Sequence, residues 1–331
     1  MKSFLIKIIA LVCFLNLIQI AFNAVLPPSW GNEVIYRKMR QMNYVGEEIN
    51  TLFIGSSRVH CHIDPNQFDA ETDDATVSWN IGAPGAAGLE VHRIVDQLIT
   101  NHKSHNVKTI YVELPRYNPP PIENEGNVRA NYFYYIPQWL SSVRFIMNRN
   151  KSQCNRGRAI LESLRPLTAN LIGTNTFRHQ VLHFFDTNLN TNLKQLRKRG
   201  FSGLDRTEKK YKLVKTRLQY AYKFYSTSID STELENEFLT NHLLNLIHKG
   251  EERGVQVVYV LMPKIPLSKY EDNFHTLEHL KSKNKLNLSN PKKHPKFYEL
   301  EYSSDKAHLN IQGAKIMTNL LSSHYNQYAV N

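Results

Sequence analysis

Short apolar runs alternate with longer amphipathic stretches along much of the chain, which predicts strands alternating with helices. Four runs are short, apolar and followed by Gly, Pro or polar residues, as is typical of buried strands; they cover about 51–55, 76–81, 109–114 and 255–262. Apolar residues recur at helical spacing over about 89–102, over 234–249 and from about Ile311. Strand, helix and strand in this order predict an α/β fold with a parallel sheet.

The alternation is interrupted in the middle of the chain. Residues 118–232 contain a Pro-rich loop, an aromatic run at 132–139, and a stretch at 194–217 with ten Lys or Arg and two acidic residues. We interpret 118–232 as an insertion on one rim of the sheet, and we expect a last short strand at 297–302. The aromatic run favours core packing over sugar stacking or membrane contact. The basic stretch is typical of a solvated helix face, with an anionic glycan or lipid headgroup as the functional alternative.

The N-terminus is the most continuously apolar part of the chain. Two lysines precede an apolar run from Ile8 to Leu15, which continues with polar interruptions to about Leu26. This pattern is typical of a secretory signal or a membrane anchor, and a buried amphipathic helix is the alternative. Because no convincing small-x-small cleavage site follows, we expect an uncleaved anchor, with secretion as the outcome if it is cleaved. The expected organisation is a transmembrane helix at 1–26, a juxtamembrane linker at 27–49 and an extracytoplasmic domain at 50–331.

Composition narrows the class of protein. The 331 residues are 41% hydrophobic and 21% charged, which is typical of a globular chain with a core. The net charge of +12 favours an anionic partner, such as nucleic acid, anionic lipid or an acidic polymer. The sequence has no zinc-finger or RNA-recognition signature, and the expected anchor argues against nucleic acid. With only Cys13, Cys61 and Cys154, neither a disulfide scaffold nor a zinc site of Cys pairs is possible.

The first candidate chemistry follows the first predicted strand. The apolar run TLFI stops at Gly55, and Ser56, Ser57 and Arg58 come directly after it. Ligands of open α/β sheets bind beyond the carboxyl ends of the strands. A serine delivered there by a tight glycine turn is a candidate nucleophile, although Gly-Ser-Ser is also ordinary loop chemistry.

A candidate base lies near the other end of the chain. Asp305 precedes His308 by three residues in a polar turn before the last predicted helix. A carboxylate at this spacing can orient the imidazole and hold the tautomer that accepts a proton. If His308 faces Ser57, the three residues form a Ser-His-Asp triad. The alternative is that Asp305 caps the following helix and His308 lies on the surface.

Two further motifs contain possible site residues. Gly82 follows the second predicted strand, where its N–H could stabilise an oxyanion, although a plain strand-to-helix turn is the alternative. The segment His60-Cys61-His62 suggests a pair of metal ligands. Two histidines need further ligands, and no matching acidic set is visible, so we expect neither a metal nor a cofactor.

Together these segments resemble the SGNH/GDSL hydrolase superfamily, in which similar blocks occur in this order. FIGSSR resembles its serine block, NIGAPG its oxyanion-glycine block and DKAHLNIQGA its Asp-x-x-His block, and the similarity covers about 50–115 and 235–325. The resemblance implies a flavodoxin-like three-layer sandwich with a helical insertion. The roles that it implies are Ser57 as nucleophile, His308 as base, Asp305 as orienting acid and Gly82 as oxyanion donor.

The sequence departs from this family pattern at two places. Ser56 stands where the family usually has Asp, and Glu113-Leu114-Pro115-Arg116 stands where a Gly-x-Asn-Asp block is expected. The side-chain oxyanion donor is therefore unassigned, and Asn80 or Asn118 could replace it. Arg58 is a candidate for binding a substrate carboxylate or phosphate, with a salt bridge as the alternative.

With these departures, the chain resembles the membrane-anchored branch of the superfamily. That branch includes the lipoteichoic-acid D-alanylation protein and envelope polysaccharide O-acetylation proteins. The resemblance implies an extracytoplasmic O-acyltransferase or esterase that acts on a cell-envelope glycan. Its expected partners are that glycan or an acyl-donor membrane protein, together with the membrane itself. The alternative, motivated by the missing Gly-x-Asn-Asp block, is a non-catalytic relative that binds a glycan or a protein partner.

Overall fold

The structure is a computed structural model, in which the chain divides into two compact units. The helical unit contains Met1–Arg37 and Asn118–Asn190, and the sheet unit contains Lys38–Tyr117 and Thr191–Asn331. The predicted insertion is thus divided between the units at residue 190. The structure describes residues 30–45, 48–86, 88–100, 106–114, 134, 136–148, 153–172, 197–205, 237–263, 276–305 and 307–328, with scattered positions between 3 and 21.

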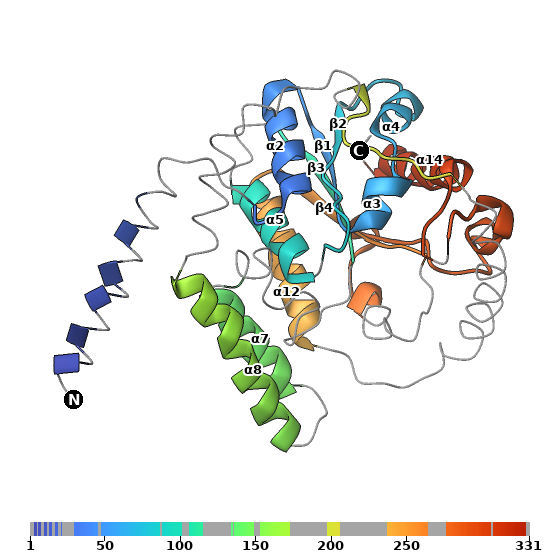
Figure 1. Cartoon of the computed structure of the whole chain (residues 1–331). Helices are drawn as coiled ribbons and strands as arrows, with labels where there is room; N and C mark the ends of the chain where they lie inside the picture. Colours follow the sequence, from blue (N-terminus) through green and yellow to red (C-terminus); the bar gives the residue numbers. More distant parts are fainter. Residues whose placement is uncertain are drawn as a thin grey trace. The chain divides into compact units, whose positions relative to one another are not determined.

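A five-stranded sheet forms the centre of the sheet unit (Figure 1). All four pairs of neighbouring strands are parallel, in the order β2-β1-β3-β4-β5. This order is that of the flavodoxin-like doubly wound sheet. The predicted α/β fold with a parallel sheet is confirmed. The strands are β1 (Thr51–Ile54), β2 (Ser78–Asn80), β3 (Thr109–Glu113), β4 (Gln256–Leu261) and β5 (Lys285–Asn287).

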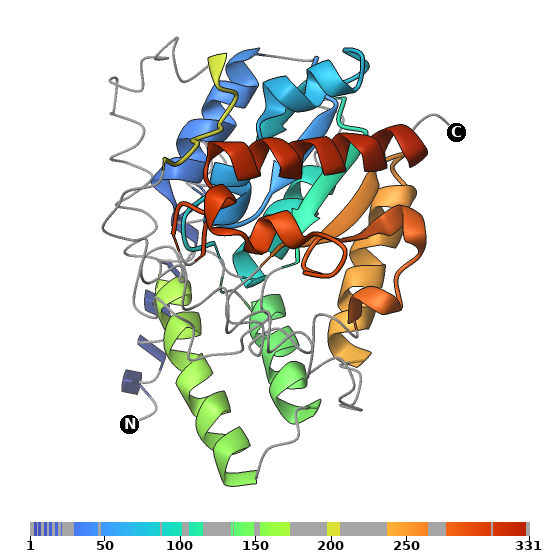
Figure 2. The same cartoon turned by 90° about the vertical axis from the view of Figure 1, so that its right-hand side faces the viewer.

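Helices cover both faces of the sheet and make three layers (Figures 1 and 2). On one face, α5 (Gly88–Thr100) packs against β1 and β3, and α12 (Glu237–Glu251) packs against β4. On the other face, α14 (Ile311–Tyr328) packs against α3 (Ser57–His62) and α4 (Pro65–Glu71). The central strands β1, β3 and β4 are buried on both sides, which is why their sequences are continuous apolar runs.

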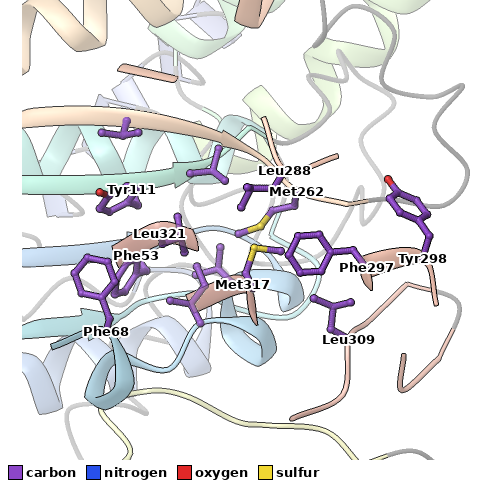
Figure 3. Packing of buried hydrophobic residues seen from close by; sticks show 14 residues of the cluster. Phe53, Phe68, Tyr111, Met262, Leu288, Phe297, Tyr298, Leu309, Met317 and Leu321 are labelled. Atoms are coloured by element: carbon purple, nitrogen blue, oxygen red, sulfur yellow. The ribbon is translucent and has the colours of Figure 1, made fainter. Parts of the chain in front are cut away.

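The core beneath α14 is built around aromatic side chains from neighbouring strands (Figure 3). Phe53 of β1 and Tyr111 of β3 are partners in register, and their rings stack with centroids 5.6 Å apart. Phe68 of α4 meets Phe53 edge-on at 4.9 Å, and Met317 and Leu321 of α14 complete the cluster. Each fully buried side chain of this size contributes roughly 1.5–3 kcal/mol, so this cluster fixes α14 against the sheet.

The last strand lies elsewhere than the sequence predicts. Residues 297–302 form parts of two 3₁₀ turns, Pro295–Tyr298 and Leu300–Tyr302, and Lys285–Asn287 is the strand that pairs with β4. This edge strand is half-buried and carries polar residues, so it has no apolar run to reveal it. The apolar residues of the predicted strand instead lie in or against the core beneath α14.

Two short helices between β1 and β2 had no signal in the periodicity. Helix α3 begins directly after the β1 turn, with Ser56 as N-cap accepting the N–H of Arg58, and α4 has Asp64 as N-cap and Pro65 at its first turn. Both are too short to show a 3.6-residue repeat. Their caps are the local sequence features that mark their starts.

Helix α2 (Glu33–Val45) lies in the segment predicted as a linker and crosses from the helical unit into the sheet unit. In the helical unit, α7 (Ile136–Asn148) and α8 (Gln153–Ile172) pack together. The indole N–H of Trp139 donates to Ser163 Oγ at 2.9 Å. Part of the aromatic run therefore serves the packing of two helices.

Among the described residues, no helix combines the length and the apolar character needed to cross a membrane. Most of the predicted anchor at 1–26 lies outside those residues. The described part of the chain thus gives no support to the predicted transmembrane helix.

Candidate active site

The structure brings Ser57, His308 and Asp305 together in one hydrogen-bonded chain. Ser57 Oγ lies 2.8 Å from His308 Nε2, and His308 Nδ1 lies 2.9 Å and 3.1 Å from the two carboxylate oxygens of Asp305. Ser57 and His308 are 251 residues apart in sequence. They meet because the end of β1 and the turn before α14 lie at the same edge of the sheet.

The turn after β1 places Ser57 and requires a glycine. A Cβ at Gly55 would lie 2.5 Å from Val59 Cγ2 and 2.6 Å from Glu113 Cβ. These distances are too short for any side chain, so a larger residue would displace α3 or β3. The chain therefore passes close over β3 before α3 begins. Ser56 caps the helix and Ser57 is its first residue, so the structure gives the two serines different positions.

The turn that carries His308 is fixed by Asp305 itself. Asp305 Oδ1 accepts the backbone N–H of Ala307 at 2.8 Å and of His308 at 3.0 Å, in addition to facing the ring. Burial raises the pKa of Asp305, but the hydrogen bonds from the His308 ring and from these N–H groups outweigh it and hold the pKa well below its ordinary value. The cap of α14 is a different residue, because Asn310 Oδ1 accepts the N–H of Gly313 at 3.0 Å.

Glu113, at the end of β3, is a site residue that the sequence analysis did not assign. It is 1% exposed, and its Oε2 accepts the backbone N–H of Ser56 at 2.7 Å. Its Oε1 accepts from Arg58 Nη1 at 3.3 Å, so Arg58 forms the salt bridge that was the alternative to substrate binding. A charged residue at the end of an apolar strand is the signal that could have identified Glu113.

Asn80 and Gly82, the groups expected to bind an oxyanion, are hydrogen-bonded to each other and to α3 in the structure. Asn80 Oδ1 accepts the Gly82 N–H at 2.9 Å. Asn80 Nδ2 donates to the carbonyls of Val59 at 2.7 Å and Ile63 at 2.8 Å. The buried amide thus joins the turn after β2 to α3, and the Gly82 N–H already has an acceptor. Asn118, the other candidate, lies outside the described residues.

A buried lysine supports the same turn from α2. Lys38 Nζ donates to the Gly82 carbonyl at 2.5 Å and to Asn80 Oδ1 at 3.4 Å, and it lies 2.8 Å from His60 Nδ1. Burial lowers the pKa of Lys38 well below its ordinary value. Burial and the nearby Lys38 lower the pKa of His60 to about 4, so at neutral pH His60 is uncharged.

One part of the predicted insertion contacts the site. We call residues 197–205 the strap; it is the yellow segment in Figures 1 and 2. Its backbone pairs with backbone groups of Asn80 at 3.0 Å, His60 at 3.0 Å and Ile311 at 3.1 Å. The carbonyl of its last residue accepts from Ser304 Oγ, next to Asp305, at 2.9 Å. The strap therefore joins β2, α3 and the turn that carries His308.

The histidines of the His60-Cys61-His62 segment bond to different parts of the fold. His60 faces Lys38, whereas His62 Nε2 accepts the backbone N–H of Leu309 at 2.9 Å. Among the described residues there is no group of three or more His, Cys, Asp or Glu side chains that could hold a metal ion. Cys61 is a buried free thiol, and burial raises its pKa to about 11.

The sequence matches no family model, and no curated protein has significant similarity to it. The chemistry of the site is therefore argued from the geometry of these residues.

Proposed function

We propose that the protein is a serine-dependent esterase or O-acyltransferase of the SGNH type. The observation that carries this proposal is the hydrogen-bonded chain from Ser57 through His308 to Asp305. A serine hydroxyl becomes a useful nucleophile when an adjacent base accepts its proton and a third group orients the base. The distances support all three roles without rearrangement.

In the proposed reaction, Ser57 Oγ attacks the carbonyl carbon of an ester while His308 Nε2 takes the hydroxyl proton. The tetrahedral intermediate collapses to an acyl-serine, and the departing alcohol takes that proton from His308. Water or a sugar hydroxyl then attacks the acyl-serine, with His308 again accepting the proton and returning it to Ser57. The carboxylate of Asp305 stabilises the imidazolium that forms in each half-reaction.

The oxyanion needs a donor other than Gly82. Ser57 is the first residue of α3, and its N–H has no acceptor among the residues that the structure describes, whereas the next N–H is bound by Ser56 Oγ. We assign the Ser57 N–H as an oxyanion donor. The side-chain donor stays unassigned.

The acceptor decides between transfer and hydrolysis, because both reactions share the acyl-serine. The net charge of +12 favours an anionic polymer such as an envelope glycan. The placement of this domain outside the cytoplasm at a membrane is a prediction from the N-terminal sequence. Arg58 is not part of the proposed substrate contacts, because Glu113 already binds it.

A non-catalytic binding protein is the second candidate function. The observation that favours it is the engagement of both Asn80 and the Gly82 N–H, which leaves the oxyanion site short of donors. A protein of this kind would keep the three-layer fold and bind a glycan or a protein partner without turnover.

The test is labelling of the full-length protein with a fluorophosphonate, in which an activated serine displaces fluoride from phosphorus. We expect labelling of the wild type and of Ser56→Ala, because Ser56 contributes a helix cap rather than a nucleophile. For Ser57→Ala we expect labelling to be lost, because the variant has no hydroxyl that could displace the fluoride.

Two outcomes would overturn the proposal in different ways. Labelling that survives in Ser57→Ala would remove that residue as the nucleophile. A folded wild type that is not labelled at all would favour the binding protein.

A further inference from the structure

Helix α3 holds the proposed nucleophile at its first residue and a buried histidine at its last. His62 is 1% exposed, and its Nε2 accepts the backbone N–H of Leu309 at 2.9 Å. Leu309 directly follows His308. The six-residue helix that contains Ser57 is thus also bonded to the residue that follows His308.

The two histidine rings also touch. The centroids of His62 and His308 lie 5.9 Å apart, and the ring planes meet at 75°, an edge-to-face arrangement. A ring in this position limits the rotation of His308 away from Ser57. His62 therefore restrains the base through its backbone and through its ring.

The hydrogen bond to Leu309 fixes the chemical state of His62. A ring nitrogen that accepts an N–H carries no proton, so the proton of the neutral ring is on Nδ1. Burial, with the nearby His308 and Arg58, lowers the pKa of His62 well below its ordinary value, which agrees with a neutral ring.

The other ring nitrogen makes this arrangement costly. His62 Nδ1 is buried and has no hydrogen-bond partner among the described residues. An unsatisfied buried donor destabilises the fold, and an apolar side chain of similar size would avoid that cost. The His62 ring also provides the acceptor for the Leu309 N–H. An apolar packing residue could not provide this acceptor.

We propose that His62 is a positioning residue, which holds the turn of His308 close enough to α3 for His308 Nε2 to reach Ser57 Oγ. This inference rests on the proposed function of the triad. The bonds of Asp305 and those from the N–H groups of residues 304 and 305 to the His308 carbonyl lie within the turn and fix its shape. The His62 bond joins that turn to the helix of the nucleophile, and so sets the distance between them.

The experiment compares His62→Gln with His62→Leu in the full-length protein. Gln Oε1 is as many bonds from Cα as His Nε2, so Gln can keep the acceptor, whereas Leu fills the space without one. We expect fluorophosphonate labelling of His62→Leu to slow by about 10–100-fold, because a displacement of 1 Å can cost about 10²-fold. We expect His62→Gln to stay within about threefold of the wild type. His324→Leu is the control for general destabilisation. It removes a buried imidazole of α14 that lies beside Tyr111 of β3.

Hydrogen exchange at the Leu309 amide provides a readout that does not depend on activity. We expect protection to be lost in His62→Leu and kept in His62→Gln. Equal exchange in the two variants, or equal labelling rates, would overturn the positioning role while leaving Ser57→Ala to decide the triad. If the two variants differ in exchange at Leu309 but the wild type is not labelled, the proposed function is overturned. The His62 bond is then a structural contact only.

Discussion

At the scale of single residues, the side chains around Ser57 mostly serve the backbone rather than a substrate. Glu113 binds a backbone N–H and a guanidinium, and Asn80 binds three backbone groups of its neighbours. Buried polar groups of this kind are stable only when their hydrogen bonds are complete. The precision of the Ser57–His308 contact therefore depends on residues that need not touch the reacting atoms.

Glu113 provides a stability prediction at this scale. Glu113→Gln replaces one acceptor oxygen with a donor and leaves Arg58 partly buried without its counter-charge. We expect the free energy of unfolding, measured with urea, to fall by about 2–4 kcal/mol. The double variant Glu113→Gln/Arg58→Met should be more stable than the sum of the single effects predicts, because it removes the stranded charge. Strict additivity would show that the ion pair contributes little.

At the scale of elements, the strap shows how a segment of the insertion becomes part of the site. It contacts β2, α3 and the turn of His308 mainly through backbone atoms. Its close approach to β2 occurs at Gly200, which has φ of +86° and where a Cβ would overlap the Asn80 carbonyl. Only glycine suits both the left-handed backbone and the contact.

Gly200→Ala is therefore expected to loosen the strap. The clash and the left-handed backbone together should lower the stability by about 1–3 kcal/mol. We expect the melting temperature to fall by about 2–10 °C and fluorophosphonate labelling to slow. Gly157→Ala is the matched control, because it adds the same methyl group in open space within α8, where Ala is the better helix former. A Gly200→Ala protein that melts and reacts like Gly157→Ala would contradict this role for the strap.

At the scale of the whole molecule, the sequence predicted what depends on local pattern. The apolar runs of β1, β3 and β4 and the amphipathic α5 and α12 lie close to their predicted ranges, because both faces of the sheet are covered. The Asp305–His308 turn was recognisable because its hydrogen bonds are local. Lys38 and the strap could not be predicted, since their partners lie 22 or more residues away and no periodicity marks them. Glu113 stands out as a charge at the end of an apolar strand, but its partner Ser56 lies 57 residues away and could not be predicted.

The acid sensitivity of the protein is also a property of the whole molecule. Six buried or half-buried histidines have pKa values below the ordinary value, chiefly through burial: His60, His62, His92, His242, His294 and His324. Below about pH 6.5 the unfolded chain binds more protons at these sites than the folded one, so stability falls as the pH falls. Each site adds at most about 1.4 kcal/mol per pH unit within its window.

Urea unfolding at pH 7.5, 6 and 5 measures this effect. We expect a continuous loss of stability across the series, and a shallower loss in His62→Gln, which keeps an acceptor but does not titrate. The carboxylate of Asp305, whose pKa is lowered, adds its own loss only below about pH 4. Equal stability at pH 7.5 and pH 5 would contradict the assignment of neutral buried histidines.

The separation of Ser57 and His308 by 251 positions also imposes an order of synthesis. A ribosome adds about 5–20 residues per second, so Ser57 is made on the order of 10–50 s before His308. β4 and β5 are added only late in that interval and α14 only after it, so until then the sheet lacks its last edge and the cover of one face. If Ser57 is the nucleophile, as proposed, the nascent chain carries a serine without its base, and we expect reactivity to begin only when the final helix closes the fold.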